Sequence, residues 1–156
     1  MLNWQCYRFD QLSTIHLYAL LRLRTDVFVV EQNCPYPELD GKDCNDNTHH
    51  LLAFDGDKLE AYARLLPPGL SFPQVSIGRV VVAESGRGKG IGSVLITEAL
   101  EHCQRLWPDQ NIQIGAQLHL VNVYEKFGFV RHSDDYLEDG IPHVDMLLTK
   151  DPSATR

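Results

Sequence analysis

The stretch Arg87-Gly88-Lys89-Gly90-Ile91-Gly92-Ser93 directly follows an apolar run from Val75 to Ala83. This order predicts a strand, a glycine-rich turn and a helix. Such a turn leaves several backbone N–H groups directed at one point, where the following helix adds the positive end of its dipole. The glycines remove Cβ atoms that would keep an anion away from the backbone. The stretch therefore predicts a phosphate-binding cradle, with Arg87 and Lys89 adding positive charge at its rim.

Spacing excludes two common phosphate-binding motifs. A P-loop requires Gly-Lys followed by Ser or Thr, whereas Gly88-Lys89 is followed by Gly90. A dinucleotide-binding fingerprint requires Gly-x-Gly-x-x-Gly, and counting from Gly88 leads to Ser93 instead of a third glycine. Too little sequence follows the turn for a doubly wound nucleotide-binding domain.

The turn instead resembles the pyrophosphate-binding motif Arg/Gln-x-x-Gly-x-Gly/Ala of the GCN5-related N-acetyltransferases (GNAT). A second block, Val123-Tyr124-Glu125-Lys126-Phe127-Gly128-Phe129, resembles the Leu-Tyr-Glu-Lys-x-Gly-Phe segment of that family, and the two blocks have its order and spacing. Three further segments, residues 27–36, 61–64 and 139–143, resemble the bacterial ElaA-like branch. The resemblance extends from about residue 2 to about residue 149.

The resemblance implies a fold class as well as an activity. The order of apolar segments alone predicts an α/β or α+β domain. The family sharpens this expectation to a mixed central sheet of about six to seven strands, splayed open like a V and flanked by about four helices. Residues 2–149 are expected to form a single N-acetyltransferase domain, followed by a short C-terminal tail at residues 150–156.

Periodicity places the main elements. Strands are expected at residues 3–9, 49–54, 58–65, 75–83, 111–117, 129–132 and 143–149, with Asp55-Gly56 as a hairpin turn. Ser13 is expected to cap a first helix, in which Ile15, Tyr18 and Leu21 recur at helical spacing. The clearest helix follows the glycine turn, with an apolar stripe at Ile91, Val94, Leu95, Ala99, Cys103 and Leu106. A short helix is expected near residues 119–127, and residues 33–47 form a long loop of the kind that often carries function.

Composition narrows the partners and the compartment. The 156 residues carry a net charge of −7, which argues against a nucleic-acid footprint and is compatible with a neutral or cationic amine. No apolar run has the length of a membrane span and no leader segment is recognisable, which favours the cytoplasm. The cysteines at 6, 34, 44 and 103 form no CxxC pair, so we expect reduced thiols and no metal. The resemblance is compatible with a homodimer.

The cofactor implied by the resemblance is acetyl-CoA, used as a co-substrate. The turn would hold its pyrophosphate through main-chain N–H groups, and the pantetheine arm would follow the strand at Val80 and Val82. Many family members have an Asn seven residues before the tyrosine, where this chain has Gln117, which keeps the amide on a longer stem. The expected cofactor-binding residues are Val80, Val81, Val82, Arg87, Gly88, Lys89, Gly90, Ile91, Gly92, Ser93, Gln117 and Tyr124.

The resemblance assigns the general acid to Tyr124. A phenol, with an ordinary pKa of about 10, stays protonated at neutral pH and can donate to a departing thiolate. The alternative is a tyrosine that only packs beside Phe127. The base that takes a proton from the amine is expected to be Glu31, with His119 as the second candidate, unless a chain of waters relays the proton. Weaker candidates are Asp40, His49, His50 and Glu84.

Two arginines are unusual because they lie in predicted strands. Arg64 and Arg79 either pair with some of the 21 acidic residues or anchor a carboxylate or phosphate of the acceptor. Together with Glu31, they are the expected substrate-binding residues.

Three functions fit these observations. The first is an acyl-CoA-dependent N-acyltransferase that moves an acetyl group to a primary amine of a small molecule or protein by direct attack. The second follows from Arg24-x-x-Val27-Phe28 and Glu38-Leu39-Asp40-Gly41, which resemble the opening of acyl-homoserine-lactone synthases that use acyl carrier protein and S-adenosylmethionine. The third is a sensor module that binds acyl-CoA without turnover. The intact Arg87–Gly92 run favours coenzyme A over a carrier protein.

Overall fold

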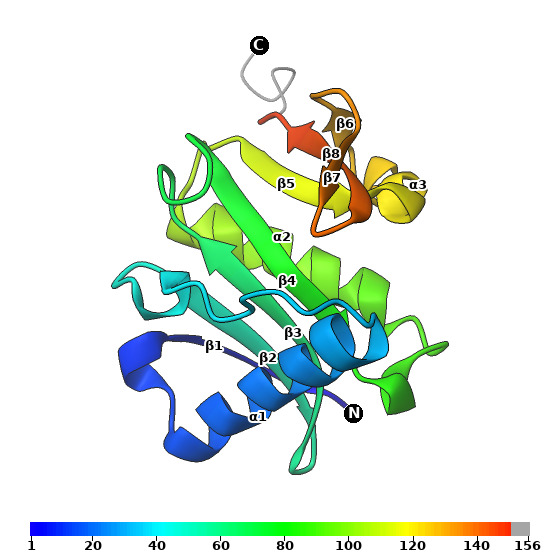
Figure 1. Cartoon of the computed structure of the whole chain (residues 1–156). Coiled ribbons are helices and arrows are strands. Elements are labelled where there is room, and N and C mark those ends of the chain that lie inside the picture. The colour runs from blue at the N-terminus through cyan, green and yellow to red at the C-terminus, as the bar shows by residue number, and fades with distance from the viewer. Residues whose placement is uncertain (151–156) are drawn as a thin grey trace.

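In the computed structural model, which describes residues 1–150, a mixed sheet of eight strands forms the centre of the molecule (Figure 1). Seven strands have the spatial order β1-β2-β3-β4-β5-β8-β6, and β7 pairs with β8. The strands are β1 (Asn3–Arg8), β2 (His49–Asp55), β3 (Lys58–Leu66), β4 (Val75–Val82), β5 (Ile112–Gln117), β6 (Val130–Arg131), β7 (Tyr136–Glu138) and β8 (Ile141–Leu148). The β2–β3 hairpin turns at Gly56, which has a positive φ of 60°.

Three α-helices lie among the described residues, and they cover both faces of the sheet. They are α1 (Thr14–Arg24), α2 (Ile91–Leu106) and α3 (Val121–Glu125), and a π-helical turn, η2 (Thr25–Glu31), continues α1. Short 3-10 turns are η1 (Phe9–Gln11), η3 (Lys42–Cys44), η4 (Glu84–Gly86) and η5 (Leu118–Leu120). Figure 1 shows α1 crossing one face in front of β2 and β3, while α2 lies behind the sheet. The expected α/β fold is confirmed, with one strand more than the upper expectation because the stretch that contains β7 is too polar to suggest a strand.

Each face of the sheet buries its own apolar cluster. The cluster beneath α2 is formed from alternate residues of β3, such as Ala61, Ala63 and Leu65, together with Leu95 and Ala99 of the helix. The cluster beneath α1 uses the opposite face of the same strands and includes Leu20, Leu52, Phe54, Leu59, Tyr62 and Val81. The alternation follows from the two-residue period of a strand.

The stripe expected on α2 is correct for the buried residues Leu95, Ala99 and Cys103. Val94, which was expected in the stripe, is 45% exposed, and Ile96 is buried in its place. The helix therefore meets the sheet with a face rotated slightly from the one that the pattern predicts.

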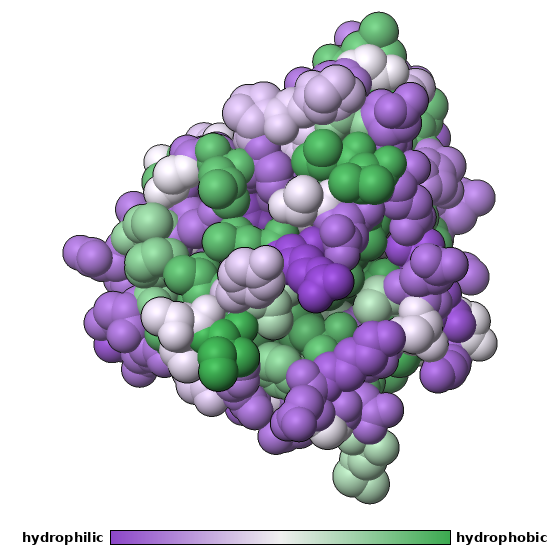
Figure 2. All heavy atoms as spheres, turned by 60° about the horizontal axis from the view of Figure 1, so that its bottom comes forward, coloured by the Kyte–Doolittle hydropathy of each residue, from purple (hydrophilic) through white to green (hydrophobic). Residues whose placement is uncertain are grey.

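The buried face of α1 differs from the expected one. Ser13 caps the helix as expected, because its Oγ accepts a hydrogen bond from the N–H of His16 at 3.1 Å. Ile15 and Tyr18 are 77% and 72% exposed, however, whereas Leu20 and Arg24 are completely buried. A prediction from hydrophobic periodicity assigns arginines to the exposed face of a helix. Because Arg24 is buried, the predicted inward face of α1 was wrong. The lower face of Figure 1, turned forward in Figure 2, accordingly shows apolar side chains among hydrophilic ones.

The sheet opens between its two central strands. β4 and β5 are parallel neighbours only at Val75–Ile112 and Ser76–Gln113. Beyond these pairs, β4 stays with β3 as far as Val82, and β5 stays with β8 as far as Gln117. A bulge in β4 places Arg79 at a positive φ of 50°, which is rare for a residue with a side chain. This parting is the V-shaped splay that the resemblance implies.

A buried ion network holds the loop at residues 33–47 against the α1 face. Arg24 donates to Oε2 of Glu38 at 2.5 Å and to Oδ1 of Asp43 at 2.7 Å. Arg64 reaches Asp43 at 3.1 Å and Asp40 at 2.8 Å. Arg79 completes the set, with its Nε 2.9 Å from Oε2 of Glu38. The interpretation of the two strand arginines as ion-paired residues is therefore confirmed.

We expect Asp43→Asn to destabilise the fold by about 3–5 kcal/mol, because it leaves Arg24 and Arg64 buried with one counter-charge fewer. Urea unfolding at neutral pH measures this difference. Asp46→Asn is the matched control, since Asp46 lies in the same loop and is exposed. It should change the free energy of unfolding by no more than about 0.5 kcal/mol. Equal effects of the two substitutions would contradict a stabilising role of the network.

The same network predicts a loss of stability in acid. Burial alone would raise the pKa of Asp43, but hydrogen bonds and charge from Arg24 and Arg64 outweigh it and hold the pKa below its ordinary value. A lowered pKa in the folded state contributes stability above the unfolded value of about 4, and this stability is lost as the pH falls below it. Between about pH 6 and pH 3, the free energy of unfolding measured in urea should therefore fall less steeply in Asp43→Asn than in the parent chain. Identical slopes in the two proteins would contradict this contribution of Asp43.

Candidate active site

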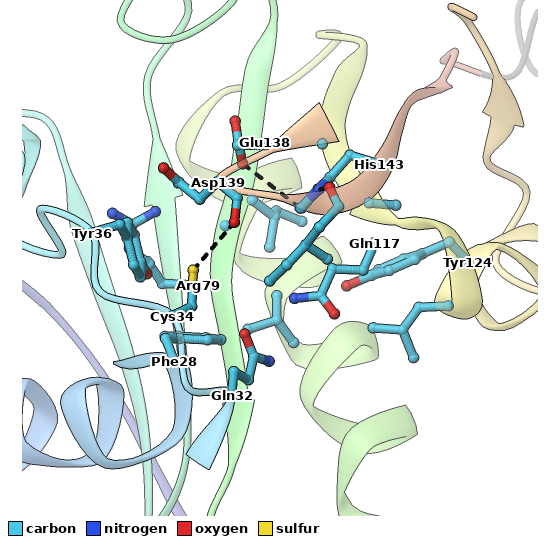
Figure 3. A pocket seen from close by; sticks show the side chains of 17 residues that line it. Phe28, Gln32, Cys34, Tyr36, Arg79, Gln117, Tyr124, Glu138, Asp139 and His143 are labelled. Atoms are coloured by element: carbon cyan, nitrogen blue, oxygen red, sulfur yellow. Dashed lines mark hydrogen bonds and ion pairs between the residues drawn. The ribbon is translucent and has the colours of Figure 1, made fainter. Parts of the chain in front are cut away.

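A cavity of about 140 Å³ lies where β4 and β5 part. Its walls come from β4, β5, α3, the β7–β8 hairpin and the segment that follows α1 (Figure 3). The middle of one wall is main chain, because β4 residues past Ser76 have no strand partner on the β5 side. The lining residues are Phe28, Gln32, Cys34, Tyr36, Ile77, Gly78, Arg79, Val80, Gly115, Ala116, Gln117, Leu120, Tyr124, Glu138, Asp139, Ile141 and His143.

Tyr124 reaches this cavity from α3. It is 9% exposed, and its ring packs edge-to-face against Phe129 with the centroids 5.8 Å apart. Burial raises the pKa of its phenol to about 12. Figure 3 shows its hydroxyl directed toward the amide of Gln117 at the end of β5. The tyrosine therefore packs against Phe129 instead of the expected Phe127, while its hydroxyl faces the cavity.

The open edge of β4 connects the cavity with the glycine turn. Val80 lines the cavity, whereas Val81 points to the opposite face and is buried in the cluster beneath α1. Free N–H and C=O groups along this edge can pair with the amides of an extended ligand as a neighbouring strand would. Val80 is thus on the side of the strand that such a ligand would follow. Val81, also expected to bind the cofactor, pairs with Tyr62 of β3, and the carbonyl oxygen of Val82 accepts a hydrogen bond from Nε of Arg87 at 3.3 Å.

The turn has the form expected of an anion cradle. Gly88 and Gly90 have positive φ angles of 78° and 77°, and a Cβ at either position would meet nothing within 4 Å. Within residues 1–150, the N–H groups of residues 88–93 are not donors in any main-chain hydrogen bond outside helices and strands. α2 begins at Ile91 without a side-chain cap. These open donors at a helix N-terminus fit a pyrophosphate.

Arg87 lies beside this cradle but is held by Glu31. The two side chains form a paired contact, with Nη1–Oε2 at 2.8 Å and Nη2–Oε1 at 2.9 Å. The hydrogen bond from Arg87 lowers the pKa of Glu31. Both side chains are largely exposed, at 40% and 47%. Glu31 therefore belongs to the rim of the cradle.

The two candidate bases do not meet Tyr124 in this cavity. Neither Glu31 nor His119 is among the described residues that line it. His119 is exposed on η5, and Glu31 lies on the wall of a separate groove between η2 and the β2–β3 turn. Their expected catalytic role has no support from the geometry.

The two expected substrate-binding arginines lie at different depths. Arg64 is 3% exposed, and its two terminal nitrogens donate hydrogen bonds to Asp40 and Asp43. Arg79 lines the cavity, and its guanidinium carbon lies 5.7 Å from the centre of the Tyr36 ring. Of the two, only Arg79 can therefore touch a molecule in the cavity.

Several cavity residues received no role from the sequence. Glu138 directly precedes the turn Asp139-Gly140, and His143 lies three residues after it. Asp139 and Gly140 both have positive φ, at 50° and 78°. Asp-Gly is a strong signal for a two-residue hairpin turn, and this one followed a stretch too polar to suggest a strand. Cys34 and Tyr36 come from the long loop, and the Sγ of Cys34 lies 3.5 Å from the carbonyl oxygen of Asp139. The composition of the loop indicated a function, and only the fold shows which of its side chains face the cavity.

Residues 1–150 contain no group of three or more His, Cys, Asp or Glu side chains arranged to hold a metal ion. Across the same residues, every helix falls short of the length and apolar character needed to cross a membrane. All four cysteines in this part of the chain are free thiols.

Comparison with known proteins places this geometry in a family. The model of the acetyltransferase (GNAT) domain matches residues 26–150. Protein ElaA of Escherichia coli strain K12 is 47% identical over 146 residues, which cover 94% of this chain and 95% of ElaA. The crystal structure of Escherichia coli ElaA superposes with a TM-score of 0.89 over 94% of this chain and 99% of that one.

Two other solved structures are informative. An acyl-CoA N-acyltransferase from Pseudomonas aeruginosa is 48% identical, with a TM-score of 0.91 over 94% of this chain and 99% of that one. A CoA-dependent acyl-homoserine lactone synthase has a TM-score of 0.70 at 18% identity over 96% of this chain and 85% of that one, which shows a shared fold alone. On the family match and these identities, the chain belongs to the GNAT family of acyltransferases, in its ElaA-like branch.

Proposed function

We propose that this chain transfers an acetyl group from acetyl-CoA to a primary amine of a small molecule or peptide by direct attack. The observation that carries the proposal is the open edge of β4, which leads from a cavity containing Tyr124 to the free N–H groups of residues 88–93. A pyrophosphate, an amide-bearing arm and a reactive thioester would follow one another along this path.

Coenzyme binding would divide between backbone and side chains. The N–H groups of residues 88–93 would bind the pyrophosphate, and Lys89 is exposed at the rim, where it can add charge. The free edge of β4 at Val80 and Val82 would pair with the amides of the pantetheine arm. Gln117, at the end of β5, lines the cavity and offers its amide to the same arm.

The side chains around the cavity would then perform the transfer. When bound, acetyl-CoA supplies an activated thioester carbonyl and a thiol leaving group. Main-chain N–H groups of β4 would stabilise the negative charge that develops on the carbonyl oxygen. Tyr124 would donate its phenolic proton to the departing sulfur, since its buried phenol, with a pKa raised to about 12, is protonated at neutral pH. The acceptor amine would enter past Phe28, Tyr36 and Arg79.

We expect Gly90→Glu to weaken acetyl-CoA binding at least tenfold, because it adds bulk and negative charge to the cradle. Isothermal titration calorimetry with acetyl-CoA measures the change. Gly69→Glu is the matched control, since Gly69 also has a positive φ, of 88°, and open space around its Cβ position. It carries the same strain and charge at the far end of β4. If the parent chain is folded but does not bind acetyl-CoA, a donor on an acyl carrier protein becomes the better hypothesis.

We expect Tyr124→Phe to lower kcat by about 100-fold or more, while the Kd for acetyl-CoA changes little. Free thiol release measures kcat, with an amino acid, a polyamine and a lysine-containing peptide as acceptors. Because burial raises the pKa of Tyr124 to about 12, its ionisation should not reduce the rate of the parent chain at any pH up to about 10. Unchanged turnover in Tyr124→Phe would exclude its acid role. No turnover of the parent chain with any acceptor would favour a binding module.

A further inference from the structure

The cavity contains one histidine, His143, on the wall next to Gln117. The two residues are direct partners across β5 and β8, so their side chains belong to the same part of the site. His143 is only 7% exposed, and its ring stacks on Tyr136 with centroids 5.9 Å apart and an interplanar angle of 23°. The hairpin thus holds this imidazole in one orientation.

The contacts of His143 define which nitrogen carries the proton. Nδ1 lies 2.7 Å from the carbonyl oxygen of Ile141, and a carbonyl only accepts. Nδ1 is therefore the donor, and Nε2 of the neutral ring keeps its lone pair. Nε2 lies 3.6 Å from Oε2 of Glu138, so a proton gained there meets a carboxylate (Figure 3).

We propose that His143 is the general base of the transfer and that Glu138 is its positioning residue. This inference rests on the proposed function. Nε2 of His143 takes a proton from the acceptor nitrogen while the C–N bond forms. The C–S bond then breaks, and Tyr124 gives its proton to the sulfur. Each turnover thus leaves one extra proton on His143 and one missing from Tyr124, and water exchanges them past Glu138, whose side chain is 62% exposed.

The groups around His143 favour this role over that of Glu31. Glu31 is already paired with Arg87 outside the cavity. The charged side chain Arg79 on the opposite wall is engaged with Glu38. Near the imidazole, the Tyr136 hydroxyl donates to Oδ1 of Asp145 at 2.6 Å and Nε2 of Gln113 donates to its Oδ2 at 3.3 Å, so both oxygens of that carboxylate have partners. The titratable and charged groups of the surrounding elements are Cys34, Tyr36, Arg79, Tyr124, Tyr136, Glu138, Asp139 and Asp145.

Steady-state kinetics of His143→Gln test the proposal, with the primary amine that the parent chain acetylates fastest in the acceptor panel. We expect kcat to fall about 100-fold or more, with an unchanged Kd for acetyl-CoA. The pH profile of kcat should also differ from that of the parent chain, which a merely structural role of His143 would leave unaltered. Glu138→Gln should retain turnover and also change the pH profile of kcat, because it removes the carboxylate that lies 3.6 Å from Nε2 of His143.

Chemical rescue separates a base from a structural residue. In His143→Ala, added imidazole should restore a part of kcat that increases with its concentration, whereas pyrazole, of similar size but weakly basic, should not. Rescue that is equal with both compounds, or a His143→Gln variant with the kcat and pH profile of the parent chain, would overturn the proposal. A folded parent chain that neither binds nor turns over acetyl-CoA would overturn the proposed function and this inference together.

Discussion

The parting of β4 and β5 after two residue pairs is the constraint on which the rest of the site depends. Main-chain polar groups inside a sheet normally pair with the next strand, and leaving them free costs stability unless water or a ligand satisfies them. The structure maintains the opening by giving each strand another neighbour, β3 on one side and β8 on the other. The free edge is therefore rigid, and a ligand that pairs with it does not need to order it first.

The bulge at Arg79 links this opening to the loop at residues 33–47. A positive φ of 50° is unfavourable for an arginine, and here the side chain gains a hydrogen bond to Glu38 and a place over the ring of Tyr36. The same loop is held by Arg24 and Arg64 through their ion pairs. Three arginines balance the three carboxylates of Glu38, Asp40 and Asp43, so the network buries charge without a net excess. The bulge in β4 and the position of the loop at residues 33–47 therefore depend on each other, because both are held by the contacts of Arg79 at the cavity wall.

The sequence predicted the parts of the site whose chemistry is local. The turn at residues 87–93 needs glycine for its backbone angles, and α2 has a strong apolar period, so both were found at nearly their observed bounds. Tyr124 and Gln117 were also placed in the cavity, through their spacing from the family motif. Ion pairs between segments that are distant in the chain could not be predicted from local sequence patterns. The contact between Glu31 and Arg87 joins η2 to the turn, and the inward position of Arg24 depends on carboxylates 14 and 19 residues away.

What the sequence by itself determined is the fold class, the glycine turn before α2 and the family, because each depends on short-range backbone preferences and on motif spacing. What only the tertiary structure decided is which polar side chains share the cavity. Glu31 and His143 are both titratable groups in segments that resemble the ElaA-like branch. The β7–β8 hairpin brings one of them beside Gln117, while the rotation of η2 directs the other to Arg87. Which of the two side chains enters the cavity depends on the packing of elements that are distant in the chain. Local patterns in the sequence do not encode that packing.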